Sequence, residues 1–91
     1  MMFRVIYHAL VVQGDIPKLA NEWKARIETA IEQRLTTRPE LYGKPLRRSL
    51  KGYRKLRVGD FRVIYRIEKR TVKILIIQHR SVVYAHAEKR V

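Results

Sequence analysis

Apolar and polar residues alternate with two different periods along this chain, and the change of period marks out the predicted elements. Residues Phe3–Tyr7 are β-branched and aromatic, which predicts a first strand. Asp15 and Pro17 predict a short helix that Asp15 caps. The segment 20–36 predicts a long helix, because large apolar residues recur every four positions. These residues are Trp23, Ile27, Ile31 and Leu35, and we expect Trp23 to anchor the core.

The second half of the chain carries three strand signals. They cover 53–58, 61–68 and 71–79, with turns at Gly59-Asp60 and Lys69-Arg70. The last segment is almost continuously apolar, which is typical of a central strand covered on both faces. Residues 82–91 predict a short C-terminal helix.

A connector at residues 37–51 joins the long helix to these strands. Two prolines and a glycine interrupt it and deny it long regular structure. We expect three leucines to pack it against the core: Leu41, Leu46 and Leu50.

The order of elements predicts one α+β domain over residues 1–91, because a chain of this length has no room for a second core. We expect a small two-layer domain of order β-α-α-β-β-β-α, with an antiparallel-dominated, four-stranded sheet. Two N-terminal helices pack on one face of the sheet, and a short C-terminal helix ends the chain. The first strand must pair with the last, since it would otherwise be isolated.

The charge of the chain is strongly positive and unevenly placed. The net charge is +13, and eleven Lys or Arg residues lie between Lys44 and Arg70 with only two acids, Asp60 and Glu68. Such a balance favours a polyanion or an acidic protein as partner. The chain has no cysteine, no visible signal peptide and no apolar run of about 18 residues. We therefore expect a cytoplasmic protein without a membrane partner.

The alternation of side chains gathers cations on one face of the predicted sheet. That face carries Lys55, Arg57, Arg62 and Arg66 around Ile64, and Gln78 and Arg80 join it, whereas His79 points toward the core side. The plain alternative is a solvated outer face. However, like charges on adjacent strands repel one another and cost stability. A phosphate ligand explains their convergence better.

The motifs YRKLRVGDFRVIYRI and HRSVVY, with the connector GKPLRRSLKG, resemble the RelE/ParE superfamily of bacterial toxin–antitoxin toxins. The resemblance covers nearly the whole chain. It implies either a RelE-like enzyme, which cuts mRNA in the ribosomal A site, or a ParE-like protein, which poisons DNA gyrase. In both branches an acidic cognate antitoxin wraps and neutralises the toxin. We favour the RelE-like branch, so the expected partners are the antitoxin, the ribosome and mRNA, with gyrase under the alternative.

The resemblance also implies site residues. The catalytic positions of RelE-type nucleases fall on Lys55, Arg57, Arg62, Arg80 and Tyr84. Tyr53 stands where the family pattern has a second lysine. We expect further RNA contacts from Arg47, Arg48, Lys51, Tyr53 and Arg66.

The expected chemistry is a metal-independent attack of the RNA 2′-hydroxyl on the adjacent phosphate, with no cofactor. Arg62 and Arg80 would bind the phosphate oxygens. The proton acceptor is left open between Lys55 and Tyr84. A non-catalytic module that binds RNA or antitoxin is a further alternative.

Overall fold

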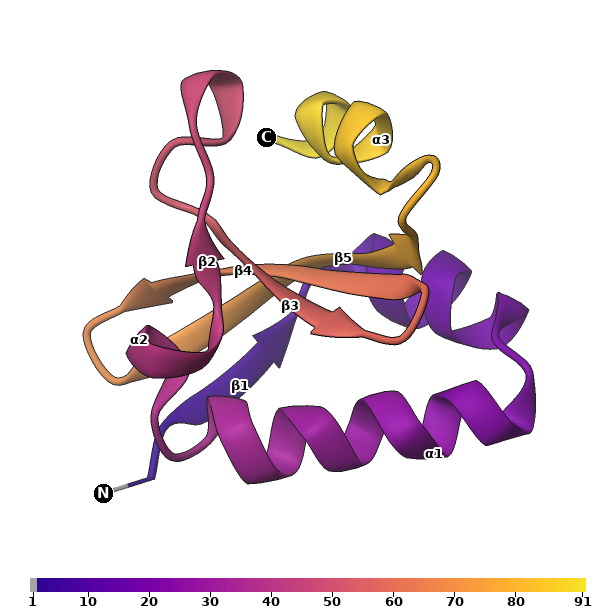
Figure 1. Cartoon of the computed structure of the whole chain (residues 1–91), viewed down its shortest axis with the longest axis horizontal. Helices are drawn as coiled ribbons and strands as arrows, with labels where there is room; N and C mark the ends of the chain where they lie inside the picture. The colour runs from indigo at the N-terminus through magenta and orange to yellow at the C-terminus, as the bar shows by residue number, and fades with distance from the viewer. Residues whose placement is uncertain (1) are drawn as a thin grey trace.

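The computed structural model describes residues 2–91 as three layers, with a five-stranded sheet between helices (Figure 1). The strand order is β1-β5-β4-β3-β2. The strands are β1 (Arg4–Tyr7), β2 (Lys44–Pro45), β3 (Arg54–Val58), β4 (Phe61–Glu68) and β5 (Thr71–His79). β1 runs parallel to β5, as the need for a partner predicted, and the other neighbours are antiparallel.

The prediction of four strands was wrong by one, because β2 is formed inside the connector. Its two residues, Lys44 and Pro45, pair with Lys55 and Arg54 of β3. A strand of two residues that includes a proline is too short to show an alternation of apolar and polar residues, so the sequence did not indicate it. Proline is tolerated in β2 because β2 is an edge strand. β4 and β5 have the predicted bounds.

The turn between β3 and β4 depends on Gly59. Its φ of +58° lies in the left-handed region, which glycine adopts without steric cost. A Cβ atom at this position would also lie 2.4 Å from Cη2 of Trp23. The Trp23 ring packs 4.9 Å from the ring of Phe61 (centroid to centroid) and against the core, as predicted. The β3–β4 turn and the long helix that carries Trp23 therefore hold each other in position.

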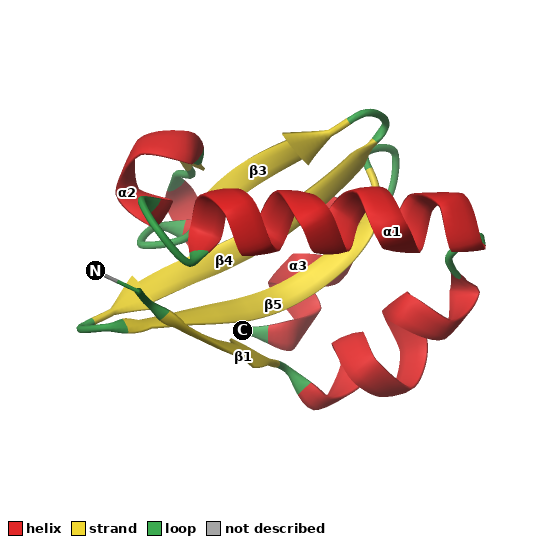
Figure 2. Cartoon of the chain, turned by 90° about the horizontal axis from the view of Figure 1, so that it is seen from below, coloured by secondary structure: helices red, strands yellow, loops and turns green. Residues whose placement is uncertain are grey.

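Helix α1 (Asn21–Ala30) continues through a π-helical turn (Ile31–Leu35), which confirms the predicted helix at 20–36. Figure 2 shows α1 lying across one face of the sheet. Its apolar residues Ile27, Ile31 and Leu35 are buried against the sheet. Each such side chain stabilises the fold by roughly 1.5–3 kcal/mol.

Helix α3 (Val83–Arg90) packs on the opposite face of the sheet, so the predicted two-layer arrangement was wrong (Figure 1). Val83 and Ala87 of α3 cover Ile64, which we expected on an open face and which is fully buried. An irregularity in the β4–β5 pairing gives β5 one extra residue, and Leu75 and Ile76 both reach this second core.

The segment after β1 forms a π-helical turn (Val11–Asp15) and a 3₁₀ turn (Ile16–Lys18). The predicted short helix is this 3₁₀ turn, with Asp15 directly before it and Pro17 in its first turn, but the Asp15 side chain does not cap it. Its carboxylate is buried and accepts a hydrogen bond of 2.9 Å from the N–H of Ile77. β1 ends at Tyr7, opposite Ile74, so Asp15 supplies the acceptor that a longer strand would have provided.

The connector contains a single helical turn, α2 (Pro39–Tyr42), and a 3₁₀ turn (Arg48–Leu50). Leu50 is buried in the second core and Leu46 packs against it, as predicted. Leu41 is 65% exposed, so its predicted packing was wrong. No helix within residues 2–91 has both the length and the apolar character needed to cross a membrane.

Candidate functional site

A hollow of about 470 Å³ lies where the turn between β3 and β4 meets the junction of β5 and α3. Its lining residues are Lys55, Arg62, His79, Arg80, Ser81 and Tyr84. Four of the five residues predicted as catalytic are therefore together. They come from β3, β4, the end of β5 and the first turn of α3, so the site exists only in the folded chain.

Arg62 is held by the backbone of its own hairpin. Its Nη1 donates hydrogen bonds of 2.9 Å to the carbonyl oxygens of Gly59 and Phe61. Both bonds use one nitrogen, which leaves Nη2 and Nε to donate to a ligand. The guanidinium group is thus positioned before any anion arrives, and less conformational entropy is lost on binding.

Arg80 is more loosely held at the edge of the hollow. Its backbone N–H donates a hydrogen bond of 2.8 Å to the carbonyl oxygen of Asp60, which ties the end of β5 to the β3–β4 turn. Its side-chain Nε lies 3.8 Å from Oδ1 of Asp60, and both side chains are more than 60% exposed. An exposed pair of this length contributes little to stability. The Arg80 side chain can therefore exchange this carboxylate for a phosphate.

Lys55 and Tyr84 are neighbours within the hollow. The Lys55 ammonium lies 5.5 Å from the centroid of the Tyr84 ring, which is within cation–π range. Tyr84 is half-buried, because its ring also packs against the core under α3. The two groups that sequence analysis left open as proton acceptor therefore face the same space.

His79 was missed as a residue of the hollow. Its ring meets Phe61 edge-on at 5.8 Å, on the side of the sheet that we expected, but the side chain is exposed and borders the hollow. Its Nδ1 accepts a 3.1 Å hydrogen bond from the N–H of Ser81 and lies 2.9 Å from Ser81 Oγ. In the neutral ring the proton then resides on Nε2. The signal in the sequence that could have indicated this role was the position of His79 as the last residue of the predicted strand at 71–79.

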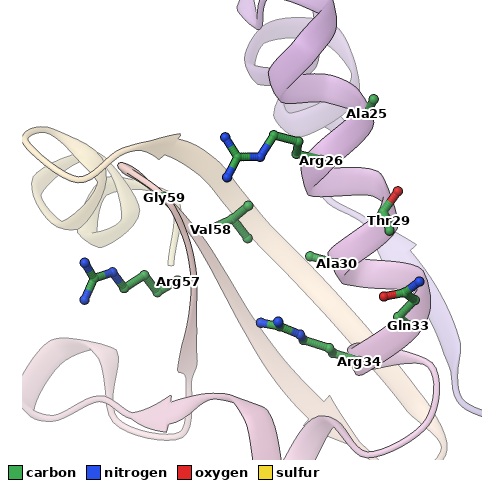
Figure 3. Close-up of a pocket in the computed structure, with 9 residues that line it drawn as sticks. All are labelled: Ala25, Arg26, Thr29, Ala30, Gln33, Arg34, Arg57, Val58 and Gly59. Carbon is green, nitrogen blue, oxygen red and sulfur yellow. The ribbon is translucent and has the colours of Figure 1, made fainter.

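Arg57 is the predicted catalytic residue that does not line the hollow. It pairs with Arg62 across β3 and β4 but is exposed, and it borders a second cavity between β3 and α1. In Figure 3 its side chain projects from β3 away from α1.

The cationic face does not continue along the whole sheet, because α3 covers its centre. Tyr53 and Arg66 lie beyond it and line another cavity of about 450 Å³. There the Arg66 guanidinium lies 5.8 Å from the Tyr53 ring centroid and pairs with Glu68 at 3.0 Å. Hydrogen bonding from Lys73 and the nearby Arg66 charge lower the pKa of Glu68. Tyr53 and Arg66, which we expected to contact RNA, are thus separate from the hollow.

The remaining predicted RNA contacts lie on the loop beside α3. Arg47, Arg48 and Lys51 are all exposed, and Arg48 has a φ of +58°. Leu46 and Leu50 of the same loop pack into the core under α3. The loop therefore has a fixed apolar side and presents these cations to solvent, outside the hollow itself.

The lining of the hollow suits an anion. It contributes three basic side chains, Lys55, Arg62 and Arg80, and no carboxylate. The first turn of α3 adds the positive end of a helix dipole. Over residues 2–91, no three histidine, aspartate or glutamate side chains gather closely enough to hold a metal ion.

Comparisons with known proteins place this geometry in a family. Residues 3–84 match the family described as "ParE toxin of type II toxin-antitoxin system, parDE". Toxin RelE of Mycobacterium tuberculosis is 35% identical over 83 residues, which is 86% of each protein. Toxin RelG of the same organism is 46% identical over 52 residues, 55% of this chain, and the match spans 60% of the length of RelG.

Solved structures agree with these relatives. The toxin–antitoxin complex RelBE2 of M. tuberculosis contains a chain with a TM-score of 0.81 and 33% identity, covering 88% of this chain and 100% of that one. E. coli RelE in the free state, as a mutant, shares the fold, with a TM-score of 0.78 over 100% of this chain and 99% of RelE at 16% identity. The chain described above is therefore a member of the RelE/ParE superfamily, the toxins of type II toxin–antitoxin systems.

Proposed function

We propose that this toxin is a ribosome-dependent endoribonuclease that cleaves mRNA in the ribosomal A site and thereby stops translation. The observation that carries the proposal is the convergence of Lys55, Arg62, Arg80 and Tyr84 on one hollow. Relatives that are named RelE toxins support it.

The reaction needs a proton acceptor, charge stabilisation and a proton donor. The 2′-oxygen forms a bond to phosphorus while the bond from phosphorus to the 5′-oxygen breaks, which yields a 2′,3′-cyclic phosphate and a 5′-hydroxyl. Arg62 and Arg80 stabilise the negative charge on the phosphate oxygens, the kind of effect that is usually the largest in a preorganised site. Lys55 as the neutral amine, or Tyr84 as the phenolate, takes the proton from the 2′-hydroxyl, and the leaving 5′-oxygen takes up a proton from water in the open hollow. Proton transfer of this kind contributes roughly 10²- to 10⁴-fold.

The exposure of the site supports the need for the ribosome. Arg80 is 63% exposed, so water screens its charge until another surface covers the hollow. The hollow also offers few groups that could hold an RNA strand with its 2′-oxygen aligned for attack on phosphorus. The ribosome would supply both the orientation of the mRNA and the exclusion of water.

An acidic antitoxin is the second partner that we propose. The net charge of +13 favours a partner of opposite sign. The similar RelBE2 protein is known as a toxin–antitoxin complex.

The match to the ParE family favours a second candidate function, the poisoning of DNA gyrase. One experiment separates the two candidates: primer extension on a reporter mRNA in a translation extract, with and without the purified protein. Cuts within codons, on translated message alone, support the nuclease. An intact message, together with gyrase-dependent DNA cleavage, would replace it with the second candidate.

A further inference from the structure

The cavity that contains Tyr53 and Arg66 is built on a row of side chains that crosses three strands. Ile6 of β1 pairs with Lys73 of β5, and Lys73 pairs with Arg66 of β4. Cross-strand neighbours project from the same face of a sheet, so these three side chains form one floor. Tyr53, directly before β3, continues the row, and its ring centroid lies 5.8 Å from the Arg66 guanidinium. We call this space the Tyr53 cavity.

The size and the walls of the Tyr53 cavity suit a small aromatic ligand. Its volume is about 450 Å³, within the range of about 300–1,000 Å³ that is typical of small-molecule sites. Ile6 is 44% exposed there, and the end of α3, which lies over this face of the sheet (Figure 1), adds Val91 at 58%. Tyr53 is half-buried because its ring packs against the core under α3. The ring is therefore held in place, and a ligand that covers the aliphatic side chains can also stack on it.

The Tyr53 cavity is also positively charged, and none of its lining residues is acidic. Its cations Arg66 and Lys73 share one partner outside the lining, Glu68, at 3.0 and 3.1 Å. These three side chains are 45–47% exposed, and exposed ion pairs contribute little to stability. A phosphate group can therefore replace the Glu68 carboxylate between the two cations.

We propose that the Tyr53 cavity is a nucleotide-binding site, separate from the hollow. The base stacks on Tyr53 and covers Ile6, while the phosphate lies between Arg66 and Lys73. Cations beside an aromatic stacking surface are the usual means of holding a nucleotide without reading its base. His8 adds a donor, because its Nδ1 accepts a 3.0 Å hydrogen bond from the N–H of Leu10 and the neutral ring then carries its proton on Nε2.

The test measures binding without ribosomes, so it does not depend on the proposed nuclease. Adenosine 5′-monophosphate is titrated into the purified protein, and NMR follows the methyl groups of Ile6 and the amide of Lys73. Both signals should shift and saturate with a Kd below about 1 mM. Ribose 5-phosphate, which lacks the base, and adenosine, which lacks the phosphate, should each bind about tenfold more weakly.

The RNA trinucleotide pApApA separates two sources of the nucleotide. Weaker binding of the trinucleotide than of adenosine 5′-monophosphate would assign the Tyr53 cavity to a free nucleotide. Equal or tighter binding would assign it to a nucleotide within an RNA strand.

Substitutions test each part of the Tyr53 cavity, and circular dichroism checks that each variant is folded. Tyr53→Leu keeps an apolar side chain on the core but removes the ring, so it should raise the Kd of adenosine 5′-monophosphate about tenfold. Arg66→Gln should raise it by a similar factor, whereas Arg70→Gln, the matched loss of one charge in the β4–β5 turn, should change it less than about twofold. Glu68→Gln removes the competing carboxylate and should lower the Kd about threefold.

Three results would overturn the nucleotide site. The first is no shift of the Ile6 and Lys73 signals at about 10 mM adenosine 5′-monophosphate. The second is equal binding of ribose 5-phosphate. The third is loss of the shifts in the double variant Arg62→Gln and Arg80→Gln, which would place the nucleotide in the hollow. A failed translation assay would count only against the nuclease, so the two failures are distinguishable.

Discussion

Asp15 and Arg90, 75 residues apart in sequence, form a buried bidentate ion pair. Arg90 Nη1 lies 2.8 Å from Asp15 Oδ2, and Nη2 lies 2.9 Å from Oδ1. Nη1 also donates to the carbonyl oxygen of Leu75 at 3.0 Å. The pair therefore fastens the end of α3, and with it Tyr84, to the edge of β5.

We expect Asp15→Asn to destabilise the protein by about 3–5 kcal/mol, because it leaves the buried Arg90 charge without its partner. Urea unfolding followed by circular dichroism measures this change in the free energy of unfolding. The double variant with Arg90→Met should recover part of the loss, since no charge then stays buried. A change below about 1 kcal/mol for Asp15→Asn would contradict the account.

Acid should remove the same stabilisation. Burial opposes ionisation of Asp15, but hydrogen bonds from Arg90, the N–H of Ile77 and Gln78 outweigh it and lower the pKa of the carboxyl. A lowered pKa in the folded state adds stability above the unfolded value, about 3.9, and this stability is lost as pH falls through the folded value. The difference in urea midpoint between wild type and Asp15→Asn should therefore shrink below about pH 4. A constant difference from neutral pH to about pH 2 would contradict this.

Gly43→Ala should destabilise the fold by about 1–3 kcal/mol. An added Cβ would lie 2.1 Å from Oη of Tyr65, which is buried and donates a hydrogen bond of 2.7 Å to the carbonyl oxygen of Pro39. The loss is read from thermal or urea unfolding. A Cβ added at Gly14 would meet no atom within 4 Å, so Gly14→Ala is the matched control. In a Tyr65→Phe background the Gly43→Ala penalty should be smaller, and an equal penalty would exclude the hydroxyl as its cause.

Much of the site was readable from the sequence because strands alternate with a period of two. That rule put Lys55 and Arg62 on one face and, with the last strand, brought Arg80 beside them. It failed at Leu75, where the extra residue shifts the phase and α3 covers Ile64. The apolar run of β5 did indicate cover on both faces. No local sequence pattern indicates the Asp15–Arg90 pair, since each residue taken by itself looks like an ordinary surface charge.

Arg62→Ala and Arg80→Ala should each lower mRNA cleavage in a translation extract by roughly 10²- to 10³-fold, the usual loss when one group that stabilises the transition state is removed. Arg70→Ala, in the exposed β4–β5 turn, is the matched control and should cleave as wild type does. Circular dichroism and urea midpoints check that each variant is folded. Wild-type cleavage by either Arg62→Ala or Arg80→Ala would refute its assignment to the phosphate.

Tyr84→Phe separates two roles of the same ring. If the hydroxyl transfers a proton, its removal should slow cleavage by roughly 10²-fold while the packing of the ring under α3 is kept. The rate of a single cut is measured by primer extension at timed intervals, with Tyr7→Phe as a control outside the hollow. An unchanged rate would make Tyr84 a stacking surface for a base. Lys55, whose ammonium lies 5.5 Å from that ring, would then be the proton acceptor, and Lys55→Met should carry the loss instead.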